Sequence, residues 1–150
     1  ERDPYYSTNN VPMSEVYSYI ASEINADYVA WINVTCPLVK SKIYDIAVTK
    51  FRKIIKKHDC LLSAKINKEN FFFRNKPINF KLNPWPRSQD LEPLVSLPFA
   101  INILSRKNLE KWGSCVGKKP YFYFIDPVTC TDIDEKHNFD FCEMMYKKRK

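Results

Sequence analysis

The feature that most constrains the fold is a strand–helix–strand pattern within residues 28–66. The segment YVAWINVT (28–35) is short, apolar and rich in β-branched and aromatic residues, which is typical of a buried strand. Apolar residues at helical spacing follow over about 42–57, after a potential N-cap at Ser41, and CLLSAKI (60–66) again resembles a strand. Two strands joined by a crossover helix are normally parallel. The pattern therefore predicts an α/β fold with a mostly parallel sheet.

The same alternation continues through the rest of the chain. We expect three further helices: one over 15–25 capped by Ser14, a short one between Ser105 and Gly113, and a last one capped by Asn138. We also expect two short strands in 71–82 and strands at 99–105 and 121–126. A length of 150 residues suits a single α/β domain, 1–150. The proline-rich stretch NPWPRSQDLEP fits no strand, so about 67–95 is predicted to be a protruding arm.

Composition narrows the classes of function. No apolar run approaches the ~18 residues of a membrane span, and the five cysteines include no CxxC pair, which argues against zinc binding and a disulfide framework. Reduced, buried thiols are typical of a cytoplasmic protein, which is the localisation we expect. Only two glycines are present, so a Gly-rich phosphate loop is absent from this sequence.

The net charge of +7 is concentrated in two basic runs, KFRKIIKK (50–57) and KKRK (147–150). The first run falls on the expected helix, opposite its apolar residues, and so reads as a solvated helix face. A polyanion-binding patch is the alternative. Binding to nucleic acid ranks below the other functions considered. It would need basic residues interleaved with aromatic ones on one face, whereas these runs lie on the back of a helix and in a tail.

A cluster of carboxylates stands just before the last helix, in TCTDIDEKHNFDF (129–141). Ligands of open α/β sheets bind beyond the carboxyl ends of strands, which points to this segment and to the end of strand 28–35. Asp132 and Asp134 would point to one side of an extended chain, about 6–7 Å apart at Cα. Oxygen ligands of this kind favour Mg²⁺ or Mn²⁺. A D-x-D pair also occurs in ordinary surface loops, so spacing alone leaves both interpretations open.

Two segments resemble the acylneuraminate (CMP-sugar) cytidylyltransferase family. NVTCPLVKSKIYDIAVTKF (33–51) is similar to the family's Q-x-T-S-P-L segment and its helix, and TCTDIDEKHNFDFCEMM (129–145) resembles its closing DID motif. RSQDLEP (87–93) is a looser match between them. The resemblance implies a Rossmann-like sheet with flanking helices, of the nucleotidyltransferase (GT-A-like) type. It covers only the second half of the family's domain, so we expect the N-terminal nucleotide-binding segment to be missing.

The resemblance implies transfer of CMP from CTP to a sugar acid or related acceptor, with release of pyrophosphate. Asp132 and Asp134 would be catalytic and hold Mg²⁺ (or Mn²⁺). Substrate-binding positions carried over are Asn33, Thr35, Arg87, Gln89 and Asn102, and nucleotide-binding positions are Arg2 and Ser14. The family's Q-P-T-S-P-L is N-V-T-C-P-L here, and its N-G-A-I-Y appears as residues 98–102. These departures affect acceptor contacts, so the acceptor stays open: an acid, a sugar or a phosphorylated small molecule.

Two further expectations concern assembly and competing functions. Trp85, in the proline-rich arm, is the candidate contact of a homodimer, because relatives pair through a segment in this region. Trp31 and the Phe71–Phe73 run are expected in the core or at an interface. A catalytically inactive scaffold of the same fold is the competing function. A sheet that lacks a central strand would also expose an edge, which predicts poor stability or close pairing with another chain.

Overall fold

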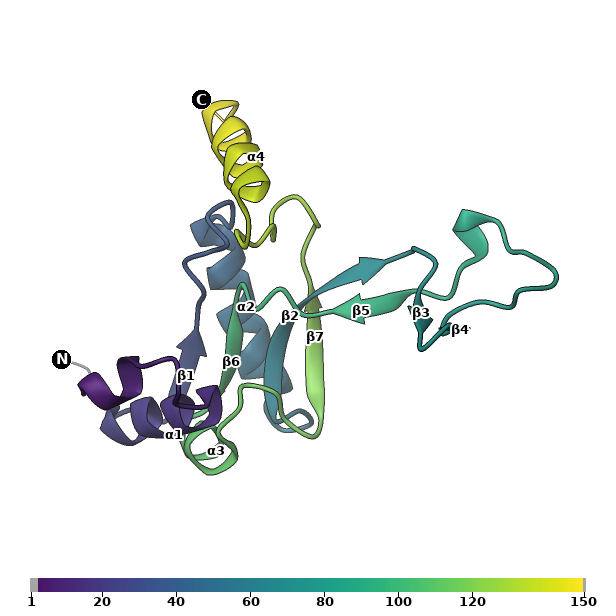
Figure 1. Cartoon of the computed structure of the whole chain (residues 1–150). Coiled ribbons are helices and arrows are strands. Elements are labelled where there is room, and N and C mark those ends of the chain that lie inside the picture. The colour runs from purple at the N-terminus through teal and green to yellow at the C-terminus, as the bar shows by residue number, and fades with distance from the viewer. Residues whose placement is uncertain (1–2, 150) are drawn as a thin grey trace.

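A computed structural model describes residues 3–149 and shows a central sheet with helices on both faces, an arm and a projecting C-terminal helix (Figure 1). The elements in chain order are η1 (Pro4–Ser7), α1 (Met13–Glu23), β1 (Tyr28–Trp31), α2 (Ser41–Ile54), β2 (Cys60–Asn67), β3 (Phe72–Phe73), β4 (Lys76–Pro77), η2 (Ser88–Asp90), β5 (Leu94–Ser96), β6 (Asn102–Ser105), α3 (Arg106–Trp112), β7 (Pro120–Phe124) and α4 (Lys136–Lys147).

The central sheet is mixed, so the prediction of a mostly parallel sheet is wrong. β6 lies between β1 and β2 and runs antiparallel to both, with Leu104 opposite Val29 on one side and Cys60 on the other. β5 also pairs antiparallel, with the outer part of β2. Among the strands within residues 3–149, only β2 and β7 are parallel neighbours, with Leu62 opposite Phe122. The fold is therefore α/β with flanking helices, but its sheet is not the parallel Rossmann type.

The reason for this error is the order of the strands. β1 and β2 do run in the same direction, as the crossover helix α2 requires, but they are not neighbours. The chain leaves β2, passes through the arm and returns as β6 in the gap between them. Apolar patterning shows that a segment is a buried strand and carries no information about its direction or neighbours.

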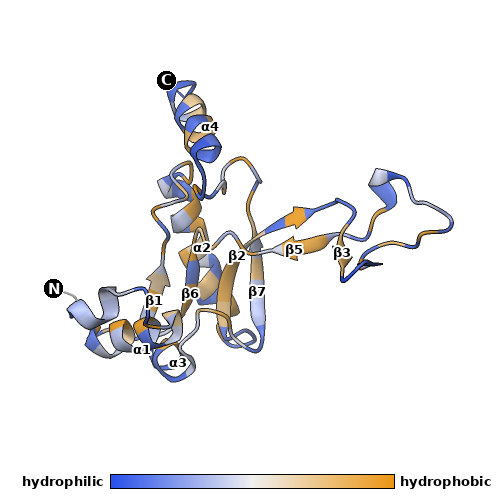
Figure 2. Ribbon diagram, viewed as in Figure 1, coloured by the Kyte–Doolittle hydropathy of each residue, from blue (hydrophilic) through white to orange (hydrophobic). Residues whose placement is uncertain are grey.

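Alternation along the strands divides the core into two layers. Leu61 and Ile103 face α2 and pack with Phe51, whereas Leu62 and Leu104 face α1 and α3. In Figure 2, β2 and β5 are largely orange, whereas β7 is paler. All five cysteines are free and buried, which agrees with the interpretation of reduced core thiols. Within residues 3–149, no helix has both the length and the apolar character to cross a membrane.

The arm consists of the segment between β2 and β5, which extends away from the sheet (Figure 1). The β3–β4 hairpin turns at Arg74 and Asn75, whose φ values of 47° and 63° are typical of a tight hairpin turn. Asn79 holds the base of the arm together: it accepts the Phe71 N–H (3.0 Å) and donates to the carbonyls of Glu69 (2.8 Å) and Glu92 (2.9 Å). A buried amide with these partners fixes an otherwise irregular segment.

The ends of the helices show which of the predicted capping residues are correct. Ser105 caps α3 by accepting the Asn108 N–H (3.2 Å), and Gly113 ends that helix at φ 57°, both as predicted. The other three predicted caps are wrong. Ser14 and Ser41 lie inside their helices, whose N-cap positions are Pro12 and Lys40. Asn138 instead occupies the third position of α4, in a reciprocal capping box with Glu135.

Candidate functional site

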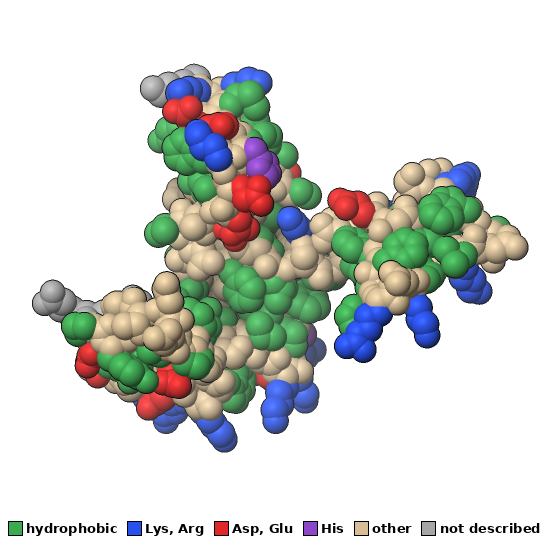
Figure 3. Space-filling model, in the orientation of Figure 1, with side chains coloured by type: hydrophobic (Ala, Val, Ile, Leu, Met, Phe, Trp, Pro, Cys, Tyr) green, Lys and Arg blue, Asp and Glu red, His purple; other side chains and the backbone are tan. Residues whose placement is uncertain are grey.

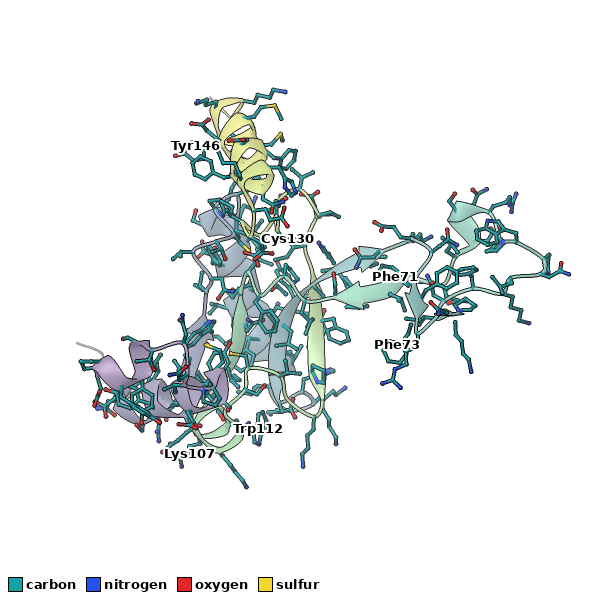
Figure 4. The ribbon with its side chains drawn as sticks, in the orientation of Figure 1. Phe71, Phe73, Lys107, Trp112, Cys130 and Tyr146 are labelled. Carbon is teal, nitrogen blue, oxygen red and sulfur yellow. The ribbon has the colours of Figure 1, made fainter. Side chains whose placement is uncertain are left out.

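The candidate site begins with a turn after β7 that redirects the chain toward β1. The carboxylate of Asp126 accepts the backbone N–H groups of Thr129 (2.9 Å) and Val128 (3.2 Å). Hydrogen bonding, above all with Thr129, lowers the pKa of Asp126 below its ordinary value. The Cys130 N–H then donates to the Asp126 carbonyl (3.1 Å). Cys130 is buried where this turn meets the base of α4 (Figure 4).

The D-x-D segment contacts the carboxyl end of β1, as the strand-end rule predicts. The Ile133 N–H donates to the Thr35 carbonyl (2.9 Å), which joins the two segments through their backbones. The buried thiol of Cys36 donates to the Pro98 carbonyl (3.6 Å) and lies beside Asp132. Burial, and then the nearby carboxylate, raises the pKa of Cys36 to about 12, so this thiol stays protonated at neutral pH.

The two aspartates occupy different environments. Asp132 is half-buried, and its Oδ1 is buried without a hydrogen-bond partner among the described residues. Asp134 is exposed. Asp and Glu side chains gather around the base of α4 (Figure 3). Within residues 3–149, no group of three or more His, Cys, Asp or Glu side chains could enclose a metal ion. A cation here would therefore rest on Asp132 and take its other ligands from water or a substrate, as Mg²⁺ commonly does.

Asn33 and Asn102 both lie near the carboxyl end of β1. The Asn33 Oδ1 accepts the indole N–H of Trp31 (3.1 Å). Asn102 pairs across the sheet with Trp31 and Leu62, and its side chain is fully buried. Neither the oxygen nor the nitrogen of the Asn102 amide has a partner in the described part of the chain. Burying an amide unpaired is costly, so Asn102 lowers the stability of the fold.

Three predicted site residues are not brought to this place within the chain. Gln89 is exposed in η2 on the arm, and Arg87, also exposed, is the N-cap of η2 and pairs with Asp90 (2.7 Å). Ser14 lies in the first turn of α1, against Gly113. Arg2 is outside the described residues.

Lys65 is a candidate that sequence reasoning missed. It lies half-buried on β2 and close enough to Cys130 to lower that thiol's pKa, although burial dominates and raises it. No ion pair involving Lys65 is formed within residues 3–149. The available signal was a single charged residue, Lys65, in the strand CLLSAKI. A cation near the D-x-D segment could contact a phosphate group.

The backbone of Phe99 is unusual for a bulky residue. Its φ is 53°, in the left-handed region that favours glycine. Phe99 stands where the resemblance places the glycine of N-G-A-I-Y. It follows Pro98, whose carbonyl accepts the Cys36 thiol, and it precedes the buried Ala100 and Ile101. A conformation suited to glycine therefore occurs where the alignment of motifs expects one.

Comparison with known proteins supports the fold only. The chain is similar to the solved structure of the bifunctional IspDF from Campylobacter jejuni, with a TM-score of 0.59 and 16% sequence identity. The similarity covers 85% of this chain and 34% of that one, so the chain spans about a third of the length of its structural neighbour. No protein-family model matches the sequence, and no curated protein matches it. At 16% sequence identity, this likeness shows a shared fold and nothing about activity.

Proposed function

We propose that this chain is part of a nucleotidyltransferase that resembles CMP-sugar synthetases and transfers CMP from CTP to a sugar acid or related acceptor. The observation that carries the proposal is the unpaired Oδ1 of Asp132, held at the end of β1 by the Ile133–Thr35 hydrogen bond. The left-handed Phe99 and the nucleotidyltransferase-like fold support the same resemblance. The buried free thiols favour the cytoplasm as its compartment.

Each residue of the site would have its own role in such a reaction. Asp132 would hold Mg²⁺, with Asp134 reaching it directly or through water. When bound, the cation would neutralise charge that develops on the phosphates. Asn33 and Thr35 border the place where an acceptor would lie, and Lys65 offers a charge for a phosphate oxygen. Because the contacts to the acceptor depart from the family pattern, the class of acceptor is left open.

The proposal is tested first by metal binding, without reference to activity. Mn²⁺ broadens amide NMR signals close to it, and we expect broadening at Thr35, Cys36 and residues 132–134. Asp132→Asn should weaken Mn²⁺ binding at least tenfold, because it removes the charge of the buried ligand. Asp45→Asn, on the exposed face of α2, removes the same charge elsewhere and serves as the matched control.

Activity is tested next, as release of pyrophosphate from CTP and Mg²⁺ over a panel of sugar acids, sugars and phosphorylated acceptors. Release that Asp132→Asn abolishes and Asp45→Asn retains would support the enzyme. Specific Mn²⁺ binding without any release would favour the inactive scaffold. Equal loss of Mn²⁺ binding in both variants would refute the site itself.

A further inference from the structure

A pocket lies at the end of the sheet opposite the candidate functional site, where β1, β2 and β7 begin and β6 ends. It has a volume of about 410 Å³, and its polar lining includes Tyr28, Lys56, Lys57, Ser105, Asn108 and Lys119. We call it the lower pocket. Figure 3 shows Lys and Arg side chains gathered along this edge. The D-x-D segment belongs to the other end of the strands, so the lower pocket is independent of the proposed catalytic site.

The lower pocket is cationic. Lys56 and Lys57 come from the turn between α2 and β2, and Lys119 directly precedes β7. None of the three lysines forms an ion pair within the part of the chain that the structure describes. Three lysines against one carboxylate, that of Asp59, leave an excess of positive charge around an open pocket. Such a site favours an anion.

The Asp59 carboxylate positions the loop that precedes β7. Its Oδ2 accepts the backbone N–H groups of Lys118 and Lys119, each at 2.9 Å. Gly117 packs so closely that a Cβ there would lie 2.3 Å from Asp59 Oδ1. The carboxylate therefore fixes the backbone that carries Lys119, rather than pairing with a lysine side chain.

Polar groups beside the lysines can complete an anion site. The Ser105 hydroxyl accepts the Asn108 N–H (3.2 Å), which leaves its hydrogen to donate. The Asn108 side-chain amide and the Tyr28 hydroxyl are further donors in the lining. His58 also lines the pocket, and its Nδ1 is buried without a partner in the described structure.

An apolar groove adjoins the lower pocket. The groove, of about 480 Å³, shares Tyr28 and Ile55 with it and continues along Val29, Val48 and Phe51. The Tyr28 ring meets the Phe51 ring edge to face, at 5.5 Å between centroids. A ligand that fits both spaces combines an anionic group with an apolar or aromatic body. Both volumes lie within the range of small-molecule sites.

We infer that the lower pocket binds a small organic phosphate: its phosphate group contacts Lys56, Lys57 and Lys119, and its apolar body lies in the groove beside Tyr28. The exposed lysines of α2 could instead attract a nucleic acid along the whole helix. The adjoining apolar groove favours the small molecule, because a polyanion would not need an apolar surface beside the lysines.

The test titrates phenyl phosphate, with inorganic phosphate as its comparison, into the ¹⁵N-labelled chain in metal-free buffer with EDTA. Removing divalent cations separates this site from the proposed catalytic one, which depends on a cation. We expect amide shifts at Lys56, Lys57, Ser105 and Lys119 and none at Thr35 or Asp132. Phenyl phosphate should bind at least threefold more tightly than inorganic phosphate.

The decisive variant is Lys56→Ala/Lys119→Ala, which should weaken phenyl phosphate binding at least tenfold. Lys42→Ala/Lys53→Ala removes the same charge from exposed positions on α2 and should change it less than twofold. Unchanged melting temperatures would show that both variants fold. Equal weakening by the two pairs would overturn the assignment in favour of diffuse charge attraction. Shifts confined to Asp132, equal affinity for both phosphates, or tighter binding of single-stranded RNA would overturn it as well.

Discussion

At the scale of single residues, Asn102 is where stability and the proposed function conflict most clearly. Its amide is fully buried with neither polar atom paired among the described residues. Replacing a buried unpaired polar group with an apolar group of similar shape can be neutral or stabilising. We therefore expect Asn102→Leu to raise the free energy of unfolding by about 1–2 kcal/mol in urea denaturation.

A matched pair of variants separates the polar effect from packing. Asn102→Ala also removes the amide but leaves space beside Trp31 and Leu62, so its stability should fall below that of Asn102→Leu. If Asn102 serves the acceptor, Asn102→Leu should bind acceptor more weakly while melting at a higher temperature. A leucine variant less stable than the alanine variant would show that the amide is satisfied in solution.

Sequence reasoning located some of the site's residues but not their environments. Asp132 and Thr35 could be placed together because both follow strands whose carboxyl ends meet at one edge. The different burial of Asp132 and Asp134 could not be predicted, since it depends on the turn at Asp126 and on Cys36. Arg87 and Gln89 resembled family residues but lie on the arm, because a motif match contains no tertiary distances.

At the scale of elements, the contact between α1 and α3 depends on Gly113. This residue ends α3 at φ 57°, and a Cβ would lie 2.7 Å from the Ser14 carbonyl oxygen. Gly113→Ala would meet both a disfavoured backbone conformation and a backbone clash. We expect the free energy of unfolding to fall by about 2–3 kcal/mol in urea denaturation.

Lys111→Ala, an exposed change on the same helix, is the control and should alter stability by less than about 0.5 kcal/mol. Wild-type stability for Gly113→Ala would mean that α1 shifts away without cost.

The types of most elements were predictable from apolar spacing, and so were the ends of α3, which rest on Ser105 and Gly113. Strand neighbours were not, because the arm places β6 between β1 and β2.

At the scale of the whole molecule, apolar side chains concentrate on the arm, far from the core. Phe73 and Trp85 are 63% and 62% exposed, and their neighbours Phe72, Ile78 and Leu82 are more than half exposed. Phe72, Phe80 and Trp85 form a chain of edge-to-face rings with centroids 5.3 and 5.2 Å apart. Phe71 and Phe73 are labelled on this arm in Figure 4. A contiguous apolar surface of this kind is typical of an interaction site.

We propose that this surface pairs two copies of the chain through their arms. Sedimentation velocity should then show a monomer–dimer equilibrium that depends on protein concentration. Phe72→Ser/Trp85→Ser should shift it toward monomer at least tenfold, because large aromatic side chains dominate interface energies. Tyr5→Ser, at a 57% exposed ring on η1, should leave the equilibrium unchanged. A wild-type chain that stays monomeric at every concentration tested would contradict the pairing and leave the arm's apolar face to a different partner.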